Sequence, residues 1–174
     1  MQRQPAPPPI AARRVSGFSL IEVLIVMSIL SILAALVLPS VMSAQDAGRK
    51  ETMATNVRII AATIESHAGS SAIALSASGY PLVLDQTWFA GGQLPLNPWS
   101  SRGLTIETVA GPADDRFPVV KTFDPSAAGQ QDCWYNSGSG AFCARVPAQA
   151  NDADTLSLFN EVNNVVAANL AATN

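Results

Sequence analysis

Apolar side chains fill residues 18–38 almost without interruption, and Glu22 is the one charged residue among them. A helix over this segment would be roughly 31 Å long, which is the thickness of a bilayer's hydrocarbon core. The pattern therefore predicts a transmembrane helix over residues 18–39, with a kink at Pro39. A charge near mid-membrane costs roughly 2.5–3.5 kcal/mol on insertion scales, so Glu22 is a candidate functional residue.

Beyond Pro39 the apolar residues recur at helical spacing, while the charged residues mostly lie off that stripe. The pattern predicts an amphipathic continuation of the helix over residues 40–69, ending near Gly69. The residues of the stripe are Met53, Val57, Ile60, Ala61, Ile64 and Ala68.

The remainder, residues 70–174, has the pattern of a globular domain. Residues 70–97 are rich in Ser, Gly and Ala and predict an irregular connection, with strands to follow at 104–109 and 117–123. A hairpin is predicted over 133–146 around a Ser-Gly-Ser-Gly turn. A C-terminal helix capped by Asp152 or Asp154 is predicted to follow. The expected fold class is α+β: a long N-terminal helix, half transmembrane, packed on a small antiparallel sheet.

The first 17 residues contain four prolines and three arginines, which predicts a disordered leader that stays in the cytoplasm. The chain is 48% apolar and only 13% charged, whereas soluble domains average about 25% charge. This deficit fits a membrane-linked, exported protein. The net charge of −3 argues against nucleic acid as the main partner.

Cys133 and Cys143 are the two cysteines of the chain, and an even number in an oxidising compartment favours a disulfide. We expect them to face each other across the hairpin, with Trp134 opposite Phe142, at disulfide distance. Two buried free thiols are the alternative. A metal site is disfavoured, because two cysteines and the distant His67 supply too few ligands.

From these patterns alone, the N-terminal segment fits a simple membrane anchor as well as a signal peptide. The run Arg13–Ile25, however, closely resembles the type IV prepilin signature. In that family a dedicated peptidase cuts after a Gly and methylates the new N-terminal Phe. The Glu and Pro of the family's helix match Glu22 and Pro39.

The resemblance implies cleavage between Gly17 and Phe18 and N-methylation of Phe18. It also implies that Glu22 meets the α-amino group of Phe18 in a neighbouring subunit of a helical fibre, since a buried charge is tolerated when paired. The implied partners are related pilin-like subunits, the prepilin peptidase and an inner-membrane assembly platform. The protein would cross the inner membrane once, with its C-terminal domain periplasmic or extracellular.

Residues 91–99 look like the Leu-Pro-x-Asp-Pro-Trp region of major pseudopilins, with Asn97 in place of the acid. The calcium-binding acidic loop of those pseudopilins has no counterpart at 137–140, which contains no carboxylate. We therefore predict no calcium site and no cofactor, although Asp114, Asp115 or Asp132 could supply ligands.

The expected function is a structural one, a pseudopilin of a type II secretion system. The alternatives are a type IV pilus pilin for adhesion, motility or DNA uptake, and a minor or non-polymerising membrane-tethered binding module. No catalytic triad or metal cluster is readable, so the chain is not expected to be an enzyme.

Overall fold

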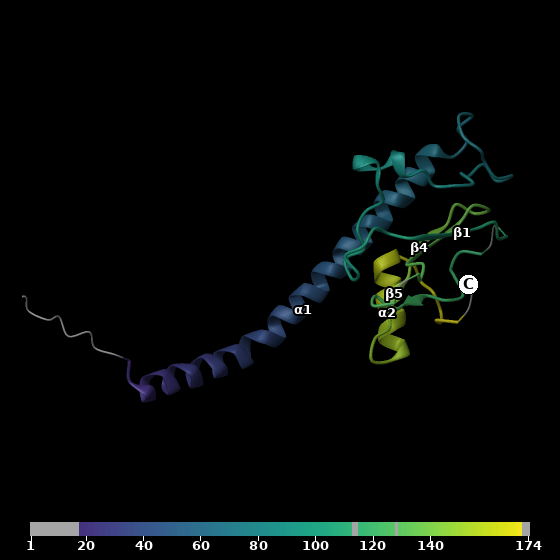
Figure 1. The fold of residues 1–174 in the computed structure, drawn as a ribbon. Helices are drawn as coiled ribbons and strands as arrows, with labels where there is room; N and C mark the ends of the chain where they lie inside the picture. Colours follow the sequence, from purple (N-terminus) through teal and green to yellow (C-terminus); the bar gives the residue numbers. More distant parts are fainter. Residues whose placement is uncertain (1–17, 113–114, 128, 172–174) are drawn as a thin grey trace, which may run out of the picture. The chain divides into compact units, whose positions relative to one another are not determined.

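The computed structural model describes residues 18–112, 115–127 and 129–171 (Figure 1). The chain divides into two compact units, Met1–Ser43 and Ala44–Asn174. The leader predicted over residues 1–17 lies outside the described residues. Helix α1, Leu20–His67, begins in the first unit and ends in the second.

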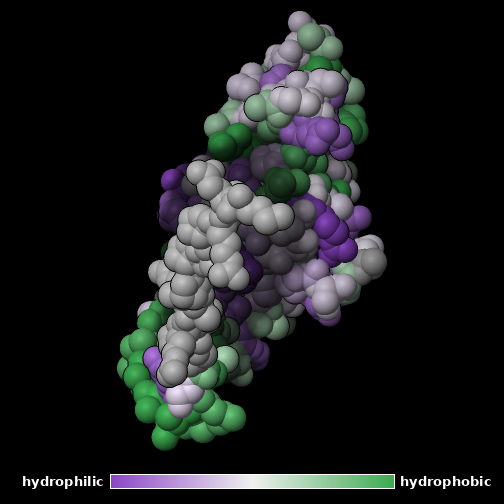
Figure 2. Space-filling model, turned by 60° about the vertical axis from the view of Figure 1, so that its left-hand side comes forward, coloured by the Kyte–Doolittle hydropathy of each residue, from purple (hydrophilic) through white to green (hydrophobic). Residues whose placement is uncertain are grey.

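In the first unit every described side chain is exposed. Figure 2 shows the visible surface of this unit as mostly hydrophobic. Within the described part of the chain, α1 is the one helix that is long and apolar enough to cross a membrane, judged by length and composition.

Two hydroxyl groups in this apolar segment have hydrogen-bond partners within the helix itself. Ser28 Oγ donates to the carbonyl of Leu24 at 2.8 Å, and Ser31 Oγ donates to that of Met27 at 2.8 Å. Such bonds to the preceding turn let serine lie in an apolar helix without a polar partner outside it. The helix continues through Pro39, which has no N–H to donate, and the predicted kink there stays a prediction.

In the second unit the predicted apolar stripe of α1 is confirmed at four of its six positions, whereas Ala61 and Ala68 are half-buried and Ala68 lies beyond the end of the helix. Met53, Val57, Ile60 and Ile64 are at most 5% exposed and enter the core. The helix ends at His67, and Gly69 follows with a φ of +72°, a conformation that glycine adopts without strain.

The strands form a mixed sheet and a separate strand pair. The sheet has the order β1-β3-β4, from Ile106–Val109, Cys133–Asn136 and Phe142–Ala144. β3 is antiparallel to β4 but parallel to β1. β2, Thr122–Phe123, pairs in parallel with β5, Val146–Pro147. The α+β class is confirmed, whereas the expectation of an antiparallel sheet is wrong: the long crossover between β1 and β3 returns the chain in the same direction.

The connection after α1 is irregular, as predicted, and holds two short 3₁₀ turns, η1 (Gln86–Trp88) and η2 (Ala90–Gly92). Two of the contacts that tie it to the rest of the unit involve aromatic side chains. The buried Tyr135 hydroxyl donates to the carbonyl of Pro81 at 2.7 Å, and the His67 ring stacks on Trp88 with centroids 3.9 Å apart. Burial raises the pKa of Tyr135 to about 12.

Helix α2, Asp152–Asn163, is capped by Asn151 rather than by Asp152 or Asp154. The Asn151 side chain accepts the N–H of Asp154 at 2.8 Å. The helix packs on β4, whose outer edge is closed by Asn163: its amide accepts the N–H of Ala144 at 2.7 Å and donates to the Ala144 carbonyl at 2.9 Å. This pairing protects a sheet edge that would otherwise expose backbone groups.

Candidate assembly site

The candidate assembly site lies at the start of α1. Glu22 is in the first helical turn, and the carbonyl of Ser19 accepts its N–H at 3.0 Å. Phe18 stands four residues earlier and is 79% exposed. A negative charge in the first turn is favoured by the helix dipole. Gly17, the other half of the predicted cleavage site, lies outside the described residues.

The Glu22 carboxylate has no hydrogen bond or ion pair with any residue that the structure describes, and its side chain is exposed among exposed apolar neighbours. A carboxylate surrounded by apolar surface is costly once that surface is covered by lipid or by other helices. The site can therefore accept a cationic group that another molecule supplies.

The structure corrects the expectation for the two cysteines. Both are buried free thiols, and the predicted disulfide is not formed. The hairpin pairs Cys133 with Ala144 and Trp134 with Cys143, one residue away from the predicted register. Since successive side chains of a strand point to opposite faces, this shift places the two thiols on opposite faces of the sheet.

Each thiol sits in surroundings that disfavour the thiolate. Burial raises the pKa of Cys143 to about 12 and raises that of Cys133 well above its usual value. The Cys143 Sγ also lies 3.6 Å from the carbonyl of Arg116. These are structural positions, and their chemistry is that of small apolar residues.

The turn between β3 and β4 is organised by one buried amide. Asn136 is fully buried and donates to the carbonyls of Pro112 at 3.1 Å and Asp115 at 3.0 Å. Its oxygen accepts the N–H groups of Gly111 at 3.1 Å and Gly138 at 2.8 Å. An asparagine amide has two donors and two acceptor positions, so this side chain is fully satisfied.

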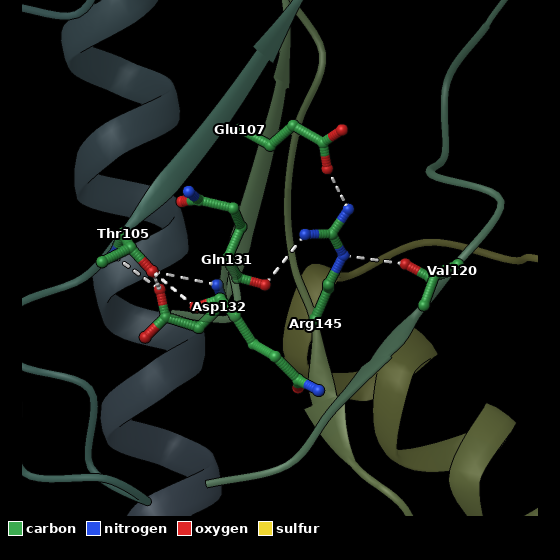
Figure 3. Close-up of polar contacts among 7 residues, drawn as sticks. Thr105, Glu107, Val120, Gln131, Asp132 and Arg145 are labelled. Atoms are coloured by element: carbon green, nitrogen blue, oxygen red, sulfur yellow. Dashed lines mark hydrogen bonds and ion pairs between the residues drawn. The ribbon is translucent and has the colours of Figure 1, made fainter. Parts of the chain in front are cut away.

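A second buried polar group joins the pseudopilin-like segment to the sheet. Asp132 accepts from the backbone and hydroxyl of Thr105, at 2.5 and 2.8 Å (Figure 3). It also accepts from the Asn97 amide at 2.7 Å. Asn97 is fully buried and also accepts the N–H of Trp99. An amide suits this position, because a carboxylate there would face Asp132 at hydrogen-bond distance, where the amide donates instead.

Arg145 forms a third polar centre, between β4 and β5. Its guanidinium pairs with Glu107 of β1 and donates to the carbonyls of Val120 at 2.9 Å and Gln131 at 2.8 Å (Figure 3). About a tenth of the Arg145 side chain is exposed, against 44% for Glu107. The guanidinium therefore joins three separate segments of the unit.

Comparison with known proteins places these features in a family. The family described as the prokaryotic N-terminal methylation motif matches residues 12–38. The type II secretion system core protein G of Pseudomonas aeruginosa is 33% identical over 103 residues, covering 51% of this chain and 71% of that protein. The chain belongs to the type II secretion system core protein G family. No solved structure matches the chain.

Membership in the core protein G family makes this chain a pseudopilin, a structural subunit. It also accounts for the apolar first part of α1, whose described side chains in the first unit are all exposed, because such a helix segment serves as a membrane anchor. The family consists of structural subunits and not of enzymes.

Calcium, which the resemblance to major pseudopilins implies, does not fit the residues that the structure describes. They contain no group of three or more His, Cys, Asp or Glu side chains placed to hold an ion. The turn at 137–140 has no carboxylate, and Asn136 already closes it. The oxygens of Asp132 are occupied by protein donors. Asp114 lies outside the described residues.

Sequence reasoning missed Asn136, Arg145 and the Asn97–Asp132 pair. Apart from Gly138 and Trp99, their partners lie 14 to 38 positions away along the chain, and no local spacing signals such contacts. The one available hint is their chemistry, since a buried polar side chain beside a strand requires a partner somewhere in the fold.

Proposed function

We propose that Glu22 pairs with the α-amino group of Phe18 in a neighbouring subunit and so sets the axial register of a pseudopilus. The observation that carries this proposal is the unpartnered Glu22 carboxylate one helical turn from Phe18, on a helix surface that is otherwise apolar. When such helices bundle, an unpaired carboxylate is costly and a paired one is tolerated. The axial offset between neighbouring helices that pairs Glu22 with an amino group is therefore favoured over every other offset.

The pairing requires a free amino group on Phe18. We propose that the prepilin peptidase cuts between Gly17 and Phe18 and that Phe18 is then N-methylated, in keeping with the methylation motif over residues 12–38. A methylated amine keeps its positive charge and can still donate to a carboxylate.

The proposed location is the inner membrane. The arginines of the leader stay on the cytoplasmic side by the positive-inside rule, which puts the C-terminal unit in the periplasm or outside the cell. An inner-membrane assembly platform would extract the subunits and add them to a fibre of this chain with related pilin-like subunits.

The experiment compares Glu22→Ala and Glu22→Gln with the unchanged chain, each overproduced with the secretion machinery. Fibres sheared from the cells are quantified against membrane-bound monomer. Both variants should insert and lose the leader normally, but their fibre yield should fall about tenfold or more, because the amine of the neighbour loses its counter-charge.

Glu51→Gln is the matched control. Glu51 lies on the same helix and is exposed, but it pairs with Arg58 at 3.3 Å within its own chain. This variant should form fibres like the unchanged chain. A normal fibre yield from Glu22→Ala would refute the charge pairing.

A further inference from the structure

The Arg145 side chain places a positive charge inside the C-terminal unit, with about a tenth of its surface exposed. It stands between β4 and β5 and uses three different nitrogens, Nε, Nη1 and Nη2, for three different partners. Those partners are the Val120 carbonyl before β2, the Gln131 carbonyl before β3 and the Glu107 carboxylate on β1 (Figure 3). Its own backbone N–H donates to the carbonyl of Asp132 at 2.9 Å.

The atoms around the guanidinium are of the kind that hard divalent cations take. Carboxylate and backbone carbonyl oxygens are the usual ligands of Ca²⁺ in proteins. Here these oxygens converge on a side chain of fixed charge, whose planar array of donors can serve several acceptors at once. A divalent ion at this position would have to displace the guanidinium or share its oxygens against like-charge repulsion.

We propose that Arg145 does in this chain what a bound cation would do, holding the segments at 107, 120 and 131 together, so that the C-terminal unit folds without a divalent metal. The neighbouring carboxylate agrees with this assignment, because both oxygens of Asp132 already accept hydrogen bonds from Thr105 and Asn97.

The inference is independent of the pairing proposed for Glu22. It concerns the stability of the C-terminal unit and not assembly, so either proposal can fail while the other stands.

The first measurement needs no variant. The full chain, purified in mild detergent, is unfolded by heat in excess chelator and again with millimolar CaCl₂. The two midpoints should agree within about 1 °C, since a ligand that does not bind the native state leaves its stability unchanged. A rise of several degrees with calcium would overturn the proposal.

The second measurement compares Arg145→Gln and Arg145→Lys with the control Arg58→Gln, whose exposed pair with Glu51 makes a small contribution. Arg145→Gln should lower the midpoint by roughly 5–15 °C, because Glu107 and two carbonyls lose their donor. Arg145→Lys keeps the charge but has a single nitrogen, so it should fall between Arg145→Gln and the unchanged chain.

A midpoint of Arg145→Gln equal to that of Arg58→Gln would refute the role of Arg145. If Arg145→Gln does not fold, the Lys variant and the calcium titration of the unchanged chain decide the question in the same way.

Discussion

At the scale of single residues, two polar side chains differ in whether the described part of the chain supplies a hydrogen-bond or ion-pair partner. Asn136 is fully buried with every donor and acceptor used. Glu22 is exposed, and nothing in the described residues pairs with it. A satisfied buried group stabilises one fold, whereas an unsatisfied one in an apolar surface requires a partner from outside. This difference separates a residue that serves folding from the residue that we propose to serve assembly.

The cysteines carry a prediction at this scale. Both thiols should resist alkylation in the folded chain at neutral pH, since burial raises the pKa of each and the thiolate is the reactive form. Mass spectrometry after iodoacetamide treatment should show no added label on the native chain and one label on each cysteine after denaturation without reductant. A cross-linked Cys133–Cys143 peptide in a non-reducing digest would contradict the free thiols.

At the scale of elements, the periodicity and length of the apolar pattern are sufficient to predict where α1 lies. The apolar run and the stripe after it predicted α1 to within a few residues of its ends, because a 3.6-residue pattern repeated over many turns is a strong signal. α2 ends at Asn163, because Asn164 takes a left-handed conformation at φ +52°, and Val166 lies beyond the helix, 93% exposed.

The strands show what sequence patterns do not determine. The hairpin was predicted in the right place but one residue out of register, because the Ser-Gly-Ser-Gly turn permits loops of different length and the turn sets the pairing. The parallel pairing of β1 with β3 depends on contacts between segments far apart in the chain, which no local pattern encodes. The disulfide prediction rested on that register and failed with it.

The buried stripe of α1 carries the prediction at this scale. Ile60→Ala should lower the free energy of unfolding by about 2–4 kcal/mol, because Ile60 is fully buried and its removal leaves a cavity in the core. Ile59→Ala is the matched control, since the neighbouring Ile59 is 48% exposed and should change stability by about 0.5 kcal/mol or less. Denaturant unfolding of the full chain in detergent measures both. Equal effects of the two substitutions would show that the stripe does not face the core.

At the scale of the whole molecule, the two units are built on different principles. The C-terminal unit closes its own core and pairs buried polar side chains such as Asn97, Asn136 and Arg145 internally. The described residues of the N-terminal unit bury nothing and expose a long apolar surface. Such an apolar surface is removed from water only when lipid or other subunits cover it. Membership in the core protein G family implies such a cover.

The most direct test of this account is the intact mass of this chain in fibres sheared from cells that produce the whole secretion machinery. We expect the chain to be present in the fibre fraction, to have lost Met1–Gly17, and to carry one added methyl group on Phe18. A chain that keeps its leader, or that begins near Ala44 and never enters the fibre fraction, would contradict it.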